Sequence, residues 1–176
     1  MSPTANGGRA PVWRTVADTA RDRGLIRGLL TRASDEALYQ RFQYVRRAFP
    51  DPWLSAVFCS NDPGALTLIG LLNGRAVALG HYARTAGAGA EFDLLVEDSL
   101  QHRGIGAELL QRLARAAAAD GIARLEAAVL RANTPMLHLL QHSGLAADWD
   151  TDRDVVRVAL SLPSPRHPPR PLPQAM

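Results

Sequence analysis

Lysine is absent from the 176-residue sequence, in which all twenty basic residues are arginine. Cysteine occurs once, at Cys59, so an internal disulfide cannot form. A chain without disulfides is consistent with the reducing cytoplasm, where we expect this protein. No run of about eighteen apolar residues occurs, so we expect no membrane-spanning helix. Residues 1–11 lack the apolar segment of a signal peptide. These absences predict a cytoplasmic protein without a membrane partner.

The remaining composition predicts one folded domain. Apolar residues make up 47% of the chain, which is enough to bury a core at this length. The pI near 9.7 suits an anionic ligand, but a net charge of +3 is too small to indicate nucleic acid. We expect a disordered start at residues 1–10, a single domain at residues 11–162 and a proline-rich disordered tail at residues 163–176.

Apolar periodicity and turn residues predict a mixed α/β sheet fold. Asn73-Gly74 between two apolar runs is the strongest short hairpin signal. Ser34 predicts a helix N-cap, and Pro50-Asp51-Pro52 predicts the end of that helix, which runs to about Arg47. We expect further helices at Asp18–Leu30, Ala107–Ala119 and Thr134–Ser143, strands at Val12–Val16, Ala65–Leu72, Arg75–Ala83, Phe92–Val96, Ala123–Leu130 and Val155–Leu160, and a turn at Asp148–Asp154.

The segment Glu91–Gly106 leads from an apolar strand into a glycine-rich turn that opens a helix. Such a turn exposes backbone N–H groups at a helix N-terminus and favours a phosphate-bearing ligand. A Walker A loop is excluded, because Ala107 and Glu108 follow Gly106 where Lys-Ser or Lys-Thr is needed. The dinucleotide-binding fingerprint is disfavoured, because Leu109 stands where its third glycine is needed. Glu126 nevertheless lies where a ribose-binding acid could sit.

The pattern of Gln101, Gly104, Gly106 and Ala107 resembles the acyl-CoA loop of the GNAT superfamily of N-acetyltransferases. The resemblance continues through the next strand to Asn133 and to the later Gly144-Leu145, and it covers about residues 65 to 160. It implies a mixed, mostly antiparallel sheet of about six to seven strands flanked by about four helices. It also implies acetyl-CoA as cosubstrate, with no metal.

The resemblance implies a division of the cofactor site between a strand and a loop. In this family a bulge splays the fourth strand from the fifth, and the pantetheine arm pairs with the fourth strand, here through Leu95 and Val96. Asn133 matches a family residue near the pantetheine, and it is also a plausible N-cap for the following helix. The diphosphate is expected at the amides of Gln101, Arg103, Gly104, Ile105, Gly106 and Ala107, with charge added by the Arg103 guanidinium.

The catalytic residues are where the sequence departs from the family pattern. Many members carry a tyrosine acid seven residues after the asparagine, but here that position is Leu140. An acid is not strictly required, because a thiolate is already a fair leaving group. Glu91 starts the fourth strand, where several lysine-acetylating members carry a catalytic glutamate, and Asp93 points to the same face. We expect Glu91, or failing that Asp93, to be the general base; otherwise both are solvated strand residues.

Other reactive side chains fit ordinary structural roles better. His138 and His142 have a spacing that can bind zinc, but no carboxylate pattern accompanies them, so we expect surface histidines. Cys59 is expected to be a small buried hydrophobe. Trp149 stands in an acidic turn that could flank a cationic amine but is more typical of a solvated turn.

The acceptor is the least constrained part of the prediction. The segment Ser34–Phe42 resembles a helix of Pat-type bacterial protein lysine acetyltransferases, although the first strand departs from their usual form and no regulatory domain is recognisable. Three hypotheses remain: an acetyltransferase for protein lysine, one for a small amine, and a non-catalytic acyl-CoA sensor. We expect a monomer or homodimer. The absence of lysine fits a GC-rich genome, or a lysine-modifying enzyme that cannot modify itself.

Overall fold

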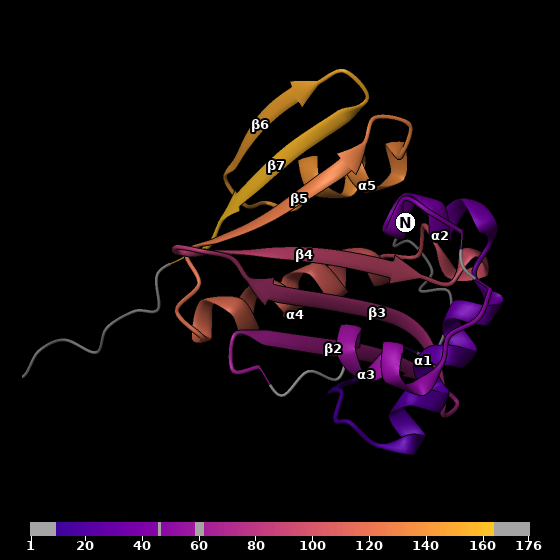
Figure 1. The fold of residues 1–176 in the computed structure, drawn as a ribbon. Coiled ribbons are helices and arrows are strands. Elements are labelled where there is room, and N and C mark those ends of the chain that lie inside the picture. Colours follow the sequence, from indigo (N-terminus) through magenta and orange to yellow (C-terminus); the bar gives the residue numbers. More distant parts are fainter. Residues whose placement is uncertain (1–9, 46, 59–61, 164–176) are drawn as a thin grey trace, which may run out of the picture.

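The computed structural model describes residues 10–45, 47–58 and 62–163, and the predictions for Cys59, for residues 1–9 and for the tail beyond Pro163 lie outside these ranges. A seven-stranded sheet runs through the protein in the order β1-β2-β3-β4-β5-β7-β6 (Figure 1). Its strands are β1 (Val12–Thr15), β2 (Ala65–Leu72), β3 (Arg75–Arg84), β4 (Gly89–Val96), β5 (Arg124–Leu130), β6 (Ala147–Asp152) and β7 (Val155–Ser161). The helices are α1 (Ala20–Arg32), α2 (Asp35–Phe42), α3 (Asp51–Phe58), α4 (Ile105–Ala119) and α5 (Thr134–Gln141), with a short 3₁₀ turn at Asp98–Leu100.

The central hairpin forms as the sequence predicts. Asn73 and Gly74 both have positive φ, 52° and 76°, the combination that a two-residue hairpin turn requires. The turn joins β2 and β3, whose antiparallel register is interrupted once, between Gly70 and Leu71. All pairings in the sheet are antiparallel except that between β4 and β5. The expected mostly antiparallel mixed sheet is confirmed.

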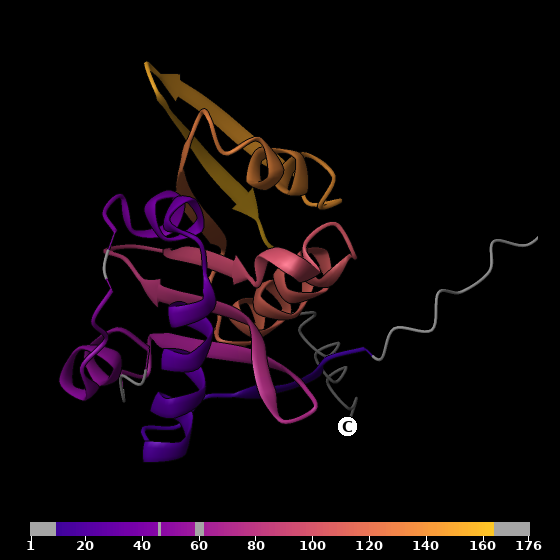
Figure 2. The ribbon, with the colours of Figure 1, turned by 90° about the vertical axis from the view of Figure 1, so that its right-hand side faces the viewer.

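Helices cover both faces of the sheet, and each face has its own core (Figure 2). The first three helices pack on one face, where Leu30, Leu38 and Leu54 are fully buried. α4 packs on the other face through a continuous apolar stripe that includes Leu109, Leu110 and Leu113, and α5 joins the same core. β4 therefore lies between two apolar layers, with alternate side chains pointing into each.

Three elements differ from the sequence-based prediction. The helix capped by Ser34 ends at Phe42, because Gln43 takes the left-handed conformation with φ 59°. The helix α3 was not expected, because Pro50-Asp51-Pro52 was interpreted only as the end of the preceding helix. It forms because Pro52 lies in its first turn, where proline is tolerated. The expected turn at Asp148–Asp154 is wrong: residues 147–152 form the edge strand β6, and the turn is confined to Arg153 and Asp154.

The strands β4 and β5 part soon after they meet. They pair in parallel only from Gly89 to Glu91, although both strands continue beyond that point. The expected bulge in the fourth strand is absent on its β3 side, where the register runs without a shift from Arg84↔Ala90 to Ala78↔Val96. The opening therefore arises because β5 turns away, as Figure 1 shows, while β4 stays flat against β3.

Candidate active site

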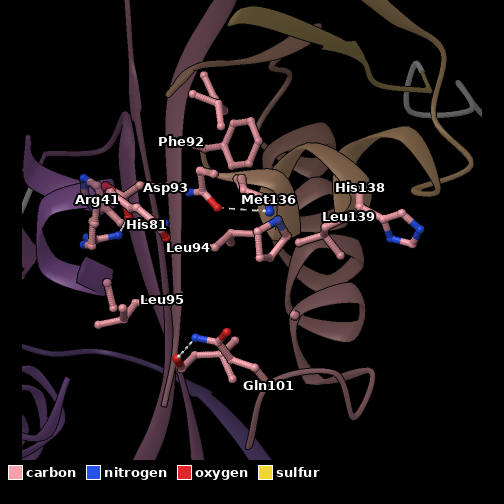
Figure 3. Close-up of a pocket in the computed structure, with 18 of the residues that line it drawn as sticks. Arg41, His81, Phe92, Asp93, Leu94, Leu95, Gln101, Met136, His138 and Leu139 are labelled. Atoms are coloured by element: carbon pink, nitrogen blue, oxygen red, sulfur yellow. Dashed lines mark hydrogen bonds and ion pairs between the residues drawn. The ribbon is translucent and has the colours of Figure 1, made fainter. Parts of the chain in front are cut away.

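A pocket of about 570 Å³ lies where β4 and β5 separate. Side chains from α2, β3, β4, β5, α4 and α5 line it, and β4 divides it into two sides (Figure 3). Met136, Leu139 and Gln101 lie on the α4 and α5 side, whereas Arg41 and Asp93 lie on the α2 side. Because both sides belong to one pocket, ligands approaching from opposite faces of the sheet can meet at β4.

On the α4 side the helix begins without a side-chain cap. Gly104 is the N-cap residue with φ 81°, a conformation that glycine adopts without strain. The first bond within the helix runs from the Glu108 N–H to the Gly104 carbonyl, at 3.0 Å. The preceding N–H groups, of Ile105, Gly106 and Ala107, therefore have no acceptor within the helix and can bind an anion.

The side chains of this loop divide between core and solvent. Ile105 is buried in the core, so only its backbone N–H is suited to ligand binding. The Arg103 side chain is exposed and is not among the residues that line the pocket. Of the residues expected to hold a cofactor, Leu95, Val96, Gln101, Gly104, Gly106, Ala107 and Asn133 line the pocket.

The register of β4 decides which of its backbone groups face the gap. The Glu97 N–H donates to the Val77 carbonyl at 2.9 Å, and the Thr85 N–H donates to the Gly89 carbonyl at 3.1 Å. Odd-numbered residues of β4 therefore bond to β3, and even-numbered residues turn their N–H and C=O groups toward β5. The backbone groups of Leu94 and Val96 accordingly face the gap, whereas those of Leu95, through which a strand-like contact was expected, bond to β3.

The amide side chains of Gln101 and Asn133 form hydrogen bonds with backbone groups at the edges of the pocket. Gln101 Nε2 donates to the Val96 carbonyl at 3.2 Å, so that carbonyl already has a partner. The Asn133 side-chain oxygen accepts from the Met136 N–H at 3.1 Å, which confirms Asn133 as the N-cap of α5. The Asn133 amide nitrogen is not needed for the cap and can donate to a ligand.

On the α2 side, two acidic residues from β4 have different surroundings. Glu91 and Asp93 project from the same face, as the sequence predicts, and both line the pocket. Asp93 pairs with Arg41, whose side chain is only 2% exposed. Glu91 is exposed and stands directly opposite Glu126 in the parallel register. Of the two residues proposed as bases, Glu91 is thus the one outside the ion pair with Arg41.

Among the pocket residues that sequence reasoning missed are Arg41 and His81. Arg41 reaches Asp93 from a position 52 residues earlier, and its guanidinium packs over the rings of Phe42 and Phe58. The His81 Nδ1 lies 2.8 Å from the Thr67 hydroxyl oxygen, and burial lowers the His81 pKa below its ordinary value of 6.5. Asp93 raises that pKa and Arg41 lowers it. His81 lies within an apolar strand, so nothing in the sequence pattern marks it.

The remaining candidates take structural positions. Leu140, where a tyrosine was considered, is buried in the core at 1% exposure. The rings of His138 and His142 stack with centroids 4.1 Å apart, and within the described ranges no group of three or more potential metal ligands is found. Trp149 is an exposed residue of β6, away from the pocket lining. None of the helices in the described ranges is long and apolar enough to cross a membrane.

Comparison with known proteins places this fold. The family model for the acetyltransferase (GNAT) family matches residues 36–145, more than half of the chain. The chain belongs to the GNAT acetyltransferase family. It is therefore an acetyltransferase, and acetyl-CoA is the cosubstrate that this family uses. No curated protein matches the chain in sequence.

Three solved structures illustrate the likeness. The GNAT domain of S. lividans PAT shares 25% identity, with a TM-score of 0.79, over 89% of this chain and 93% of that one. A variant of a cAMP-binding acyltransferase from Mycobacterium smegmatis shares 26% identity and a TM-score of 0.57, and the match covers 86% of this chain but 43% of that protein. PaiA N-acetyltransferase from Thermoplasma acidophilum, in complex with coenzyme A, shares the fold at 15% identity, with a TM-score of 0.67, over 87% of this chain and 99% of that one.

Proposed function

We propose that this GNAT protein transfers the acetyl group of acetyl-CoA to a primary amine, and that the amine belongs to a protein lysine. The observation that carries the proposal is the pocket itself: backbone donors line it on one side of β4, and Glu91 stands on the other. The likeness to the S. lividans PAT domain at 25% identity, together with the Ser34–Phe42 helix, supports lysine as the acceptor.

The residues on the α4 side fit acetyl-CoA. The N–H groups of Ile105, Gly106 and Ala107, together with the loop amides of Gln101, Arg103 and Gly104, would hold the diphosphate. The open edge of β4 at Leu94 and Val96 would pair with the pantetheine arm, and the Asn133 amide would donate to it. When bound, acetyl-CoA supplies an acetyl group activated as a thioester.

The residues on the α2 side fit the acceptor. An amine must lose its ammonium proton before it attacks, so a proton acceptor has to lie beside it. Because Asp93 is committed to Arg41, the role falls to Glu91, which is exposed at the pocket. Leu140 provides no acid, so the leaving thiolate departs unprotonated or takes a proton from water.

Release of CoA in the presence of amines tests this function. Lysine peptides, free lysine, and small mono- and diamines are compared at fixed acetyl-CoA concentration. Turnover of peptides alone supports a protein acceptor, turnover of small amines alone supports the alternative metabolite or drug acetyltransferase, and binding of acetyl-CoA without any turnover would show a sensor. Glu91→Gln should reduce turnover by roughly 10² to 10⁴, the usual span for loss of a general base. Calorimetry should show unchanged acetyl-CoA affinity, because by strand alternation Glu91 shares the β4 face of Leu95, which packs with the first three helices, and not the face of Phe92, which packs with α4.

A further inference from the structure

A row of polar side chains crosses the sheet on its α2 face. Thr67 of β2 is the register partner of His81 on β3, which is the register partner of Asp93 on β4. The neighbouring row, Ile69, Leu79 and Leu95, is entirely apolar and buried. A polar row in such a layer costs desolvation free energy and needs partners. Thr67 and His81 lie within hydrogen-bond distance of each other, and Asp93 pairs with Arg41 of α2.

His81 connects two cavities. It lines the candidate active-site pocket, and it also lines a second cavity of about 160 Å³ between β1, β2 and α3. Among the described residues, His81 alone lines both. The second cavity is large enough for several waters, and Thr15 at its margin is exposed to solvent. A proton that passes from the active-site pocket through His81 would thus reach water in a separate cavity.

The His81 imidazole has neighbours on two strands, β2 and β4, and on two helices, α2 and α3. Its Nδ1 lies 2.8 Å from the Thr67 hydroxyl oxygen, and the ring packs edge-on against Phe58 of α3, with centroids 6.2 Å apart. The charged groups facing it are Asp93 from β4 and Arg41 from α2, which form an ion pair with each other. Since Nδ1 meets Thr67, the second ring nitrogen is on the opposite edge of the ring.

We propose that His81 relays the proton of the acceptor amine from the active-site pocket to the second cavity, with Thr67 as the next member of the relay. The ammonium N–H bond breaks, directly or through Glu91, and a new N–H bond forms on the imidazole. The Nδ1 proton then passes to the Thr67 oxygen while the hydroxyl proton moves to water in the second cavity. Water in the second cavity takes up the proton as hydronium, and the ring stays neutral with its proton on the nitrogen that received the amine proton. The proposal rests on the proposed acetyl transfer.

The protonation of His81 supports this relay. Burial lowers its pKa, so the ring is neutral and able to take a proton at neutral pH. The imidazolium that forms has the Asp93 carboxylate beside it, which favours the charged ring transiently, whereas Arg41 favours release. The part of the acid-side fall in rate that belongs to His81 should therefore come at a pH below 6.5, where the ring takes up a proton in the resting enzyme.

The matched substitutions Thr67→Val and Thr67→Ser, with His81→Gln, test the relay. Valine keeps the shape of threonine without its hydroxyl, and serine keeps the hydroxyl. Thr67→Val and His81→Gln should lower kcat by on the order of tenfold to 10² at neutral pH, and Thr67→Ser by much less. The acid-side fall in rate that belongs to His81 should vanish in His81→Gln. His142→Gln, an exposed histidine away from the pocket lining, is the control and should keep the wild-type profile.

Two further measurements separate a relay from a structural role. His81→Ala should regain part of its rate when imidazole is added, because the space left by the ring lies between the two cavities and can take a small base. Titration of the His81 ring signals by NMR should give a pKa below the ordinary histidine value of 6.5, whether or not the enzyme turns over. Wild-type kcat and pH profile in His81→Gln and Thr67→Val would overturn the relay alone. A wild-type chain that releases no CoA with any amine would overturn the proposed function, and the relay with it.

Discussion

The ion pair between Arg41 and Asp93 has a role in stability that is separable from chemistry. The guanidinium is almost completely buried between two phenylalanine rings, so removing its carboxylate leaves a buried charge without its counterion. Asp93→Asn should therefore lower the free energy of unfolding by about 2 kcal/mol, in the range for hydrogen bonds to charged groups. Urea denaturation at neutral pH measures this loss.

The matched variant for this prediction is Arg41→Met, which fills the space between the rings without a charge. In the double variant the loss should be clearly smaller than the sum of the single losses, because neither partner is left unpaired. Additive losses would show that the two residues act independently. If Asp93→Asn keeps its stability but loses turnover, Asp93 rather than Glu91 is the base.

At the scale of single elements, the N-terminus of α4 offers a substitution that affects binding more than folding. A Cβ on Gly106 would lie 3.5 Å from Leu139 Cδ2 and 3.8 Å from Val96 Cγ2, which are ordinary contacts, and Gly106 lies at negative φ. Gly106→Ala should thus fold as well as the wild type, and alanine favours the helix. If the diphosphate contacts this backbone, the methyl group should weaken acetyl-CoA binding by on the order of tenfold, a loss of about 1.4 kcal/mol.

Gly104→Ala should instead affect folding, because its Cβ would meet open space but its φ of 81° is strained for alanine. This variant should lose about 1 kcal/mol of stability. Thermal melting measures the loss of stability in Gly104→Ala, and calorimetric titration measures the loss of acetyl-CoA affinity in Gly106→Ala. Unchanged acetyl-CoA affinity in Gly106→Ala would place the diphosphate elsewhere.

At the start of α5, substitutions can separate the capping role of Asn133 from its proposed role in acetyl-CoA binding. Asn133 caps the helix through its oxygen and is proposed to use its amide nitrogen for acetyl-CoA. Asn133→Asp keeps a good cap but removes the donor, so stability should be retained and affinity reduced. Asn133→Ala should lose both, with about 1 kcal/mol from the missing cap. Equal affinity in the aspartate variant and the wild type would leave Asn133 with the capping role alone.

The sequence predicts elements whose signals are local. Asn73-Gly74 specifies its hairpin because both residues accept positive φ, and the α4 stripe follows from helical periodicity. The edge strand β6 was missed because its side chains are nearly all exposed, so alternating acidic residues resemble a turn. The polar row was missed for a different reason: Thr67, His81 and Asp93 become neighbours only through strand register, which no single segment encodes.

At the scale of the whole molecule, the two sides of the pocket differ because of where the sheet opens. β4 stays paired to β3 along its length and gives Glu91 and Asp93 a fixed face, while β5 departs and leaves the opposite edge of β4 free. In the proposed function, the cosubstrate lies against one layer of helices and the acceptor against the other. The first three helices all precede the loop motif in the chain. The Ser34–Phe42 segment pointed to them, but the contact of Arg41 with Asp93 joins residues 52 positions apart and could not be predicted from either segment.

The boundary of the domain gives the last prediction. Leu162 is buried in the α4 core, and its N–H donates to the Ala123 carbonyl at 2.9 Å, so the fold needs the chain up to this residue. Beyond Pro163 the sequence is dominated by proline and arginine and has little apolar area to bury. A chain that ends at Ser164 should therefore keep the melting temperature and turnover of the full chain. A chain that ends at Ser161 should lose roughly 1.5 to 3 kcal/mol, the value of one buried leucine. Thermal melting of the two truncations side by side tests the boundary, and a large loss already at Ser164 would show that the tail packs on the domain.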